Sequence, residues 1–182
     1  MLKTYKSVKS SGISISQLML PSYSNFSGKI HGGYILSLMD QIAFACASKF
    51  SGNYCVTASV DTVDFLSPIE VGELVTMKAS VNYVGRSSMI IGIRVESENI
   101  QTGHSKHCNS SYFTMVAKDE TGQNTEVPGL ILTHLNDIRR FYNCIQQIEA
   151  RKIRNRHEVE FDYKSDDAMK NLEKYKVKVE LK

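Results

Sequence analysis

The sequence predicts an α+β fold in which an antiparallel sheet wraps around one long central helix, with a helical extension at the C-terminus. Three observations lead to this prediction. Residues 34–50 carry apolar side chains on every side of a helix, which is typical of a helix enclosed by other elements. Four later segments alternate polar and apolar side chains with the period of a β-strand. Residues 133–155 repeat apolar side chains at three- and four-residue spacing, as an amphipathic helix does.

The first part of the chain predicts a strand, a loop and the central helix. Residues 7–20 place Ile13 and Ile15 among serines and stop at Pro21, so we expect one strand followed by a turn. The loop of residues 22–33 contains three glycines. The helix is predicted to begin near Gly33 and to end near residues 51–53, because strong helix formers fill the interval.

Hairpin turns join the four alternating segments, which predicts an antiparallel sheet. The predicted strands are residues 54–65, 74–84, 87–97 and 106–117, and a polar turn over residues 119–128 closes the sheet. One face of such a sheet covers the helix, whereas its edges and open face remain unprotected. We therefore expect a homodimer with a continuous sheet, and the sequence leaves a trimer of dimers open.

We expect two regions, a folded domain over residues 7–128 and a C-terminal helix with a charged tail over residues 129–182. The helix of residues 133–155 has Thr133 or Asn136 as a candidate cap. Residues 175–181 alternate weakly and are interpreted as one short edge strand or a mobile tail. Four basic residues near the end of the helix form either a solvated face or a phosphate-binding cluster: Arg151, Lys152, Arg154 and Arg156.

Composition excludes several classes of function. A net charge of +3 over 182 residues is too small for nucleic acid as the main partner, although it favours a local basic patch and an anionic ligand. No apolar run is long enough to span a membrane, and no secretory signal is found; residues 1–11 only weakly resemble an organelle-targeting segment. The cysteines show no CxxC spacing, which predicts reduced thiols and a cytoplasmic location: Cys46, Cys55, Cys108 and Cys144.

The loop and helix between residues 25 and 40 carry the strongest candidate site. Backbone N–H groups at Gly32 and Gly33, beside His31, lie at the positive end of the helix dipole and suit an oxyanion. Asp40 returns to nearly the same helix face two turns later. Asn25 lies in the preceding loop. An oxyanion hole beside a carboxylate is what acyl transfer requires, although each feature alone is more often structural.

Two further groups of polar residues have weaker signals. Arg86, Ser87 and Ser88 form either a plain hairpin turn with a solvated arginine or a phosphate-binding turn. A metal site built from His104, His107 and Cys108 is not expected, because the three side chains cannot easily converge. No P-loop and no Gly-x-Ser-x-Gly nucleophile motif is present.

Several segments in a fixed order resemble hotdog-fold acyl-CoA thioesterases. The resemblance runs from about Ile15 to Pro128. The family includes bacterial short-chain acyl-CoA hydrolases and brain-type cytosolic acyl-CoA hydrolases. The segments that carry it are LPSYSNFSGKIHGGYILSLMD, VTASVDTVDFLSPIEVGELV, VGRSSMIIGIRVES and SSYFTMVAKDETG.

The resemblance implies a function and roles for particular residues. It implies hydrolysis of acyl-CoA to free CoA and a carboxylic acid, with coenzyme A thioester as the substrate and no cofactor. It implies that Asp40 is the catalytic carboxylate and that Asn25 meets it across a dimer interface. Arg86, Ser87 and Ser88 would hold the phosphates of CoA. Two alternatives stay open: a non-catalytic acyl-CoA-binding module, and a hotdog hydratase acting on an enoyl thioester.

Overall fold

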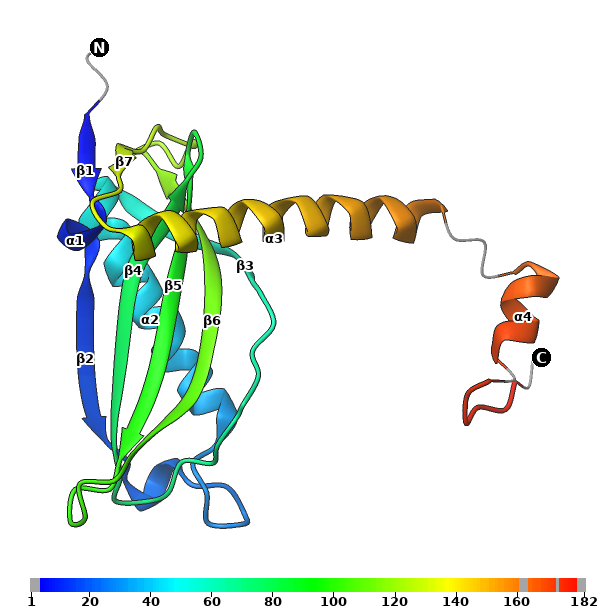
Figure 1. Cartoon of the computed structure of the whole chain (residues 1–182), viewed down its shortest axis with the longest axis horizontal. Coiled ribbons are helices and arrows are strands. Elements are labelled where there is room, and N and C mark those ends of the chain that lie inside the picture. The colour runs from blue at the N-terminus through cyan, green and yellow to red at the C-terminus, as the bar shows by residue number, and fades with distance from the viewer. Residues whose placement is uncertain (1–3, 161–163, 173, 180–182) are drawn as a thin grey trace. The chain divides into compact units, whose positions relative to one another are not determined.

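The central helix and the sheet that wraps around it form the body of the fold. A computed structural model of the chain describes residues 4–160, 164–172 and 174–179. The chain forms two compact units, Met1–Cys144 and Ile145–Lys182. Helix α2 (Gly32–Ser51) lies behind the strands in Figure 1, along the inner face of the sheet. It ends at Gly52, whose φ of 78° is the left-handed conformation that glycine adopts most easily.

Five antiparallel strands make the sheet, in the order β2-β4-β5-β6-β3. Their bounds are β2 Ile13–Leu18, β3 Tyr54–Val60, β4 Leu74–Val84, β5 Ser88–Glu98 and β6 Ser105–Lys118. Hairpins join β4, β5 and β6, as predicted from the alternation of their side chains. The structure confirms the predicted fold class, an antiparallel sheet curled around one helix.

Alternate residues of the strands pack against α2. The buried face of the helix includes Ile35, Met39, Ile42 and Phe50, each almost fully buried. The sheet presents its inner side chains to this face, and the core includes Val75, Met77, Val81, Met89, Ile91, Val95, Phe113 and Met115. Removal of this apolar surface from water is the main stabilising contribution to the fold.

The N-terminal segment differs from the single strand predicted over residues 7–20. It contains β1 (Tyr5–Ser7), the short helix α1 (Val8–Ser11) and then β2. Ser11 explains the interruption: its Oγ accepts a hydrogen bond from the Val81 N–H at 2.9 Å, beside a register shift in β4. Burying Ser11 there requires the chain to turn before β2 begins.

The strand predicted over residues 54–65 is shorter than expected. β3 ends at Val60, after a bulge between Thr57 and Ser59. Residues 61–66 then follow β6 with isolated backbone bonds, from Asp61 N–H to the Tyr112 carbonyl at 2.9 Å and from Leu66 N–H to the Cys108 carbonyl at 2.8 Å. The bulge shifts the register, so the alternation in the sequence overestimates the strand.

The C-terminal elements are β7 (Gly129–Ile131), which pairs with β1, and the helices α3 (Leu135–Glu160) and α4 (Asp166–Leu172). Neither predicted cap of α3 is correct: Asn136 lies inside the helix, and the Thr133 hydroxyl donates to the Asp137 carboxylate rather than accepting from a helix N–H. The Asp137 carboxylate instead accepts bonds from the Thr133 N–H, the Thr133 hydroxyl and the His134 N–H at 3.0–3.2 Å. One interpretation of residues 175–181 was a short edge strand. Residues 174–179 contain no strand, and residues 180–182 lie outside the described part.

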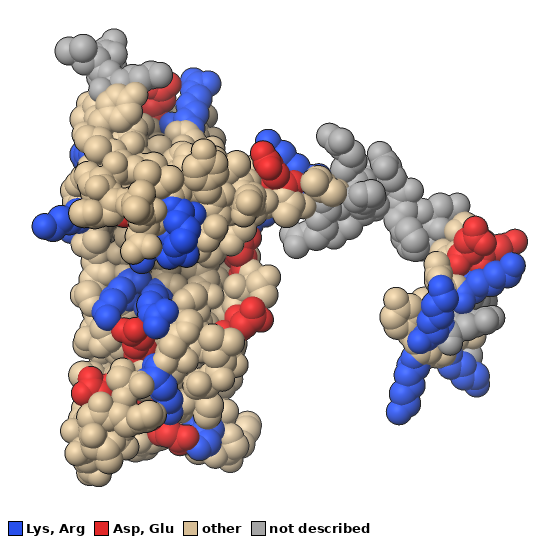
Figure 2. All heavy atoms as spheres, in the orientation of Figure 1, with Lys and Arg blue, Asp and Glu red and all other residues tan. Residues whose placement is uncertain are grey.

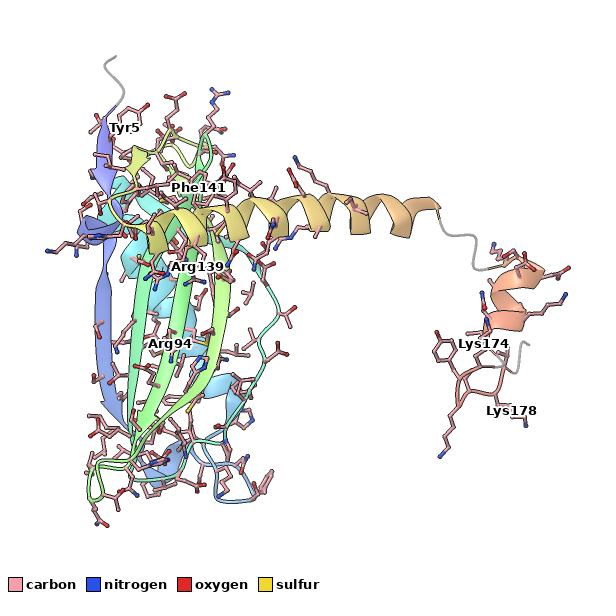
Figure 3. All side chains as sticks on the ribbon, in the orientation of Figure 1. Tyr5, Arg94, Arg139, Phe141, Lys174 and Lys178 are labelled. Carbon is pink, nitrogen blue, oxygen red and sulfur yellow. The ribbon has the colours of Figure 1, made fainter. Side chains whose placement is uncertain are left out.

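Several residues that give the start of α3 its apolar spacing are not buried. Leu135, Ile138 and Tyr142 are exposed, whereas Asp137 and Cys144 are buried. The ring of Phe141 packs on that of Tyr83 with centroids 5.1 Å apart (Figure 3). The first turns of α3 therefore lie over the outer face of the sheet, opposite α2. Within the described residues, no helix is long and apolar enough to cross a bilayer.

An ion-pair cluster on this outer face predicts a dependence of stability on pH. Glu96 accepts hydrogen bonds from Lys78 Nζ at 2.7 Å and Arg94 Nε at 2.8 Å, and these bonds lower the pKa of its carboxyl from 4.5 to about 2. The pKa is depressed in the folded state, so the cluster stabilises the fold fully above pH 4.5 and progressively less as the pH falls toward 2.

We therefore expect Glu96→Gln to lower the free energy of unfolding at neutral pH by about 1 kcal/mol, since both cationic partners are half exposed and screened by solvent. Urea unfolding of both proteins at several pH values measures the difference. The two proteins should become equally stable near the lowered pKa, and a difference that does not change with pH would contradict the assignment.

Candidate functional site

The entry of α2 is organised by His31. Its side-chain Nδ1 accepts a hydrogen bond from the Gly33 N–H at 3.0 Å, which caps the helix and places the proton of a neutral ring on Nε2. The N–H of Gly32 has no partner among the described residues. A Cβ at Gly32 would lie 3.3 Å from the ring of Phe65, so glycine permits this close approach. Because the Gly33 N–H is bonded to His31, the free donor at the start of the helix is the N–H of Gly32.

Asp40 lies on an exposed stripe of α2. The helix was predicted to be buried on all sides, and this is wrong for the single chain: Ser37, Asp40, Gln41 and Phe44 are exposed at helical spacing, in line with Gly33. The carboxylate Oδ1 of Asp40 accepts a hydrogen bond from the Thr57 hydroxyl at 2.6 Å. Asp40 is exposed, and its Oδ2 has no hydrogen bond with a described residue.

Thr57 was not among the residues predicted for the site. It was placed on a polar face of an alternating strand, and nothing in the sequence indicated that this position would face Asp40, 17 residues earlier in the chain. A serine or threonine on an edge strand next to a helical carboxylate is a pair that only the fold identifies.

Asn25 lies in the loop before α2. Its Oδ1 accepts three hydrogen bonds, from the Ser27 N–H at 2.9 Å, the Ser27 hydroxyl at 2.7 Å and the Lys29 N–H at 3.2 Å. The side chain therefore holds the loop in shape through its oxygen. Its Nδ2 has no partner in the described part of the chain and remains available as a donor. No contact joins Asn25 to Asp40 of the same chain among the described residues.

Arg86 lies in the turn between β4 and β5. Its side chain is 87% exposed, and its Nε lies 3.6 Å from a carboxylate oxygen of the equally exposed Glu126. Such a pair contributes little stability, so the guanidinium can exchange Glu126 for another anion. A Cβ at Gly85 would lie 2.8 Å from Ser88 Oγ, so a larger residue there would make the Ser88 side chain rotate.

The strand register places the turn that contains Arg86 near the end of the sheet that holds Thr57. Thr57 pairs with Met115, Met115 pairs with Met89, and Met89 pairs with Val84, immediately before the turn. Neighbouring strands lie about 4.8 Å apart, so Thr57 and Met89 are separated by about 10 Å across the sheet. A ligand that extends past the edge of β3 can therefore approach both features.

The histidines near β6 have structural bonds. Nε2 of His107 lies 2.9 Å from the Asn109 carbonyl and 2.8 Å from Ser110 Oγ. Among the residues that the structure describes, no group of three His, Cys, Asp or Glu side chains could hold a metal ion.

Known proteins resemble this chain in sequence. Residues 27–104 match the thioesterase superfamily. Protein VdlD of Helicobacter pylori is 42% identical over 137 residues, which cover 75% of this chain and 78% of that protein. The uncharacterized acyl-CoA thioester hydrolase YkhA of Bacillus subtilis is 32% identical over 149 residues, covering 82% and 87% of the two chains.

Solved structures resemble it as well. A hexameric acyl-CoA thioesterase superposes with a TM-score of 0.81 at 35% identity, covering 84% of this chain and 97% of the other. The acyl-CoA hydrolase of Staphylococcus aureus, crystallised with butyryl-CoA, CoA and CoA disulfide, gives 0.79 at 30% identity, covering 86% and 95%. That hydrolase has also been crystallised with alanine in place of an asparagine, an aspartate and a threonine, one at a time; the three positions are 15 and 17 residues apart.

Proposed function

Because the chain belongs to the thioesterase superfamily, we propose that it hydrolyses acyl-CoA to free CoA and a carboxylic acid, with Asp40 as the catalytic carboxylate. The observation that carries this proposal is the hydrogen bond between Asp40 and Thr57. Asn25, Asp40 and Thr57 are separated by 15 and 17 residues, the spacings of the three positions replaced in the S. aureus hydrolase. The correspondence supports one site built from these three residues.

The amide of Gly32 is the proposed donor to the thioester carbonyl. It lies at the N-terminus of a 20-residue helix, where the helix dipole favours negative charge on the oxygen of a tetrahedral intermediate. Gly33 already donates to His31, so its role is to hold the histidine ring in place. We assign His31 to the shape of the oxyanion site and to contact with the substrate through Nε2.

Asp40 has two possible roles, and both use the carboxylate oxygen that Thr57 leaves open. As a general base it takes a proton from water, whose oxygen attacks the carbonyl carbon to give the tetrahedral intermediate; the C–S bond of this intermediate then breaks and the thiolate leaves. As a nucleophile it attacks the carbon itself, and the C–S bond breaks to release the CoA thiolate and leave a mixed anhydride, which water then hydrolyses. Thr57 fixes the orientation of the carboxylate in either route.

We propose that the site is completed by a second copy of the chain. The exposed stripe of α2 and the free edge of β3 are adjacent, because the rings of Phe44 and Tyr54 pack edge to face with centroids 5.7 Å apart. Pairing two β3 strands would cover both features and make one continuous sheet. Asn25 of the partner would then offer its free Nδ2 to Asp40 or to the attacking water. A trimer of such dimers is consistent with the hexameric relative.

Thr57→Val is expected to lower turnover about 10- to 100-fold, because it removes one hydrogen bond to a charged group with little change in side-chain shape. Thiol release with saturating acyl-CoA measures the effect. Thr57→Ser retains the hydroxyl and should retain most of the activity. Equal activity of the valine variant and the parent protein would exclude a positioning role for Thr57.

Arg86, with the hydroxyl groups of Ser87 and Ser88, is the proposed anchor for the phosphates of CoA. We expect Arg86→Gln to raise KM about tenfold with little change in kcat, since the lost ion pair is distant from the reacting carbonyl. Steady-state kinetics with one acyl-CoA separate the two constants. Glu126→Gln removes the competing carboxylate and should leave KM the same or lower it, so a rise in that variant would contradict the assignment.

The experiment that tests the proposed function is thiol release from acyl-CoA thioesters of different chain lengths. A hydrolase releases free CoA from at least one of them, whereas an acyl-CoA-binding module binds the ligands and releases none. A hydratase would add water to an enoyl-CoA and leave the thioester intact. The hydratase is not favoured, because the described residues show no hydrogen bond between His31 and Asp40.

We further propose a reducing, cytoplasmic location and a reaction that needs no cofactor. The four cysteines are buried and unpaired, which fits a compartment where thiols stay reduced. Rat and human relatives named cytosolic acyl coenzyme A thioester hydrolase support the same compartment.

A further inference from the structure

A buried carboxylate lies immediately before β4, at the lower end of the body in Figure 1, where the loops that join the strands gather. Figure 2 shows acidic and basic side chains mixed on the surface of this end. Glu73, in contrast, is only 6% exposed. Burying a charged group is costly unless it is paired and hydrogen-bonded. The proposed hydrolysis does not use this carboxylate, so its burial needs a separate explanation.

The Glu73 carboxylate binds donors from three parts of the chain. Its Oε1 accepts a hydrogen bond from Lys106 Nζ at 2.8 Å, and its Oε2 accepts bonds from the Ser97 hydroxyl and, at 2.9 Å, from the Glu70 N–H. Burial acts to raise the pKa of Glu73, but these three donors outweigh it and hold the pKa below its usual value. Since Ser97 and Lys106 belong to β5 and β6, the ionised carboxylate ties the segment before β4 to two strands of the sheet.

The segment before β4 in turn holds the loop that carries Asn25. The Ile30 N–H donates to the Ile69 carbonyl at 2.9 Å, and Lys29 forms an isolated β-bridge with Glu70. The side chains of Lys29 and Glu70 also form an ion pair, but they are 44% and 41% exposed. Such an exposed pair contributes little stability. The rigid anchor of the loop is therefore the buried carboxylate behind this segment.

Two hydrogen bonds carry the connection from Lys29 to Asn25. The Asn25 N–H donates to the Lys29 carbonyl at 2.7 Å, and the Lys29 N–H donates to Asn25 Oδ1 at 3.2 Å. A displacement of Lys29 therefore moves both the backbone and the side chain of Asn25. A displacement of about 1 Å in a reacting group can lower a rate about 10²-fold. The position of the Asn25 amide thus depends on bonds that lead back to Glu73.

We propose that Glu73 is a positioning residue for the hydrolysis: it fixes the loop of residues 24–31 against the sheet and so holds the amide of Asn25 where the reaction requires it. The inference rests on the proposed function, because it concerns the same site. Glu73 acts through Asn25 and takes no part in proton transfer. Its effect on turnover should therefore disappear when the Asn25 amide is absent, which an effect on the folded fraction would not do.

Hydrogen exchange of the full chain, followed by mass spectrometry, tests the positioning without any substrate. We expect Glu73→Gln to raise the exchange rate of a peptide covering residues 24–31 about tenfold, because glutamine turns an N–H group toward neighbours that are themselves donors. A peptide covering residues 88–95 of β5 should exchange as in the parent protein. Glu98→Gln is the matched control, since Glu98 is exposed at the end of the same strand and its side chain has no hydrogen bond with a described residue.

Thiol release at a range of acyl-CoA concentrations tests the consequence for the reaction. Glu73→Gln is expected to lower kcat about tenfold with little change in KM. In the Asn25→Asp background the same substitution should lower kcat less than about twofold, because the amide that Glu73 positions is already gone. In the Arg86→Gln background the tenfold loss should remain, since Arg86 is assigned a separate role.

Two results would overturn the proposal. The first is an unchanged exchange rate of residues 24–31 in Glu73→Gln or, if that variant does not fold, in Ser97→Ala, which removes a single donor to the carboxylate. The second is an equal fold-loss of kcat in the parent and Asn25→Asp backgrounds, as a general loss of folded protein would give. A parent protein that releases no thiol would contradict the proposed function itself, whereas the exchange rates would still decide whether Glu73 holds the loop.

Discussion

Asp40→Asn is expected to lower the turnover of acyl-CoA by about 10²–10⁴-fold, the usual contribution of a positioned acid–base group. Asparagine keeps the size of the side chain and an oxygen that can accept from Thr57, so the bond at 2.6 Å can persist. It cannot take a proton from water, and it is a poor nucleophile. The loss should therefore appear in kcat, with KM close to its original value.

Asp64→Asn is the matched control for this variant. Asp64 is exposed, follows β3 in the chain and has no hydrogen bond with a described residue, so its replacement should leave turnover unchanged. The circular dichroism spectrum and native mass of the Asp40 variant should match those of the parent protein. Unchanged hydrolysis by Asp40→Asn would show that another group performs the chemistry.

Asn25→Asp is expected to lower turnover by about 10²–10³-fold, similar to the loss of one donor from an oxyanion site. The substitution separates two functions of the side chain. Aspartate keeps the Oδ1 acceptor that binds Ser27 and Lys29, so the loop should hold its shape. It removes the Nδ2 donor and, in the proposed dimer, brings a second negative charge toward Asp40.

Ser27→Ala provides the control for the loop. It removes one of the bonds that organise the loop, at 2.7 Å, but leaves the amide of Asn25 intact. Turnover should fall much less than in Asn25→Asp, as measured by thiol release at saturating substrate. If both variants lost the same activity, the shape of the loop rather than the amide would be the important feature.

Local pattern was sufficient to predict most of the fold. The alternation in β4, β5 and β6 defined those strands nearly to their ends, because each has one covered face and is joined to the next by a hairpin. The glycine at position 52 likewise marked the end of α2. These features depend on residues close together in sequence, which a single sequence displays.

Features that depend on distant contacts were not predicted. The apolar composition of α2 suggested burial on all sides, yet Phe44 and Asp40 lie on an exposed stripe that only the position of β3 defines. The partner of Asp40, Thr57, lies at the start of a bulge that the alternation did not reveal. The turn before α3 is closed by Asp137, a residue whose burial depends on the sheet beneath it.

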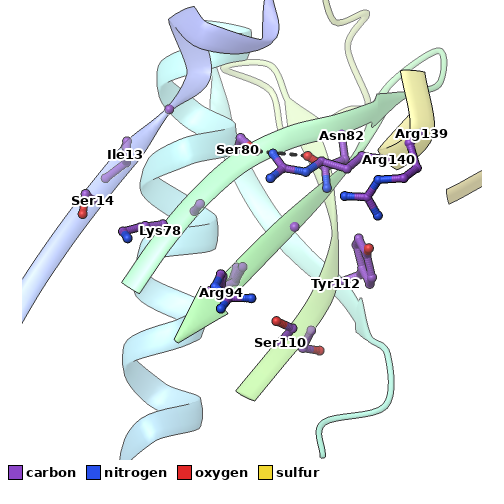
Figure 4. Close-up of a pocket in the computed structure, with 15 residues that line it drawn as sticks. Ile13, Ser14, Lys78, Ser80, Asn82, Arg94, Ser110, Tyr112, Arg139 and Arg140 are labelled. Atoms are coloured by element: carbon purple, nitrogen blue, oxygen red, sulfur yellow. Dashed lines mark hydrogen bonds between the residues drawn. The ribbon is translucent and has the colours of Figure 1, made fainter. Parts of the chain in front are cut away.

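The phosphate-binding alternative for the basic residues near the end of α3 stays a prediction. Arg151 and Lys152 lie in the second unit, and the side chains of Arg154 and Arg156 lie outside the described part. Within the first unit, Arg139 and Arg140 line a cavity together with residues of β2, β4, β5 and β6 (Figure 4). A run of basic residues can be seen in the sequence alone. The cavity, in contrast, exists because the first turns of α3 lie over the sheet.

The central claim is that each site takes Asp40 from one subunit and Asn25 from its partner, and mixing two inactive variants tests it most directly. Subunits of Asn25→Asp uniformly labelled with ¹⁵N and unlabelled subunits of Asp40→Asn would be combined by refolding together, and native mass spectrometry would confirm mixed dimers from their intermediate mass. A mixed dimer holds one intact site, so equal mixing should restore about a quarter of the parent activity. Mixed dimers without any recovered thiol release would contradict the shared site.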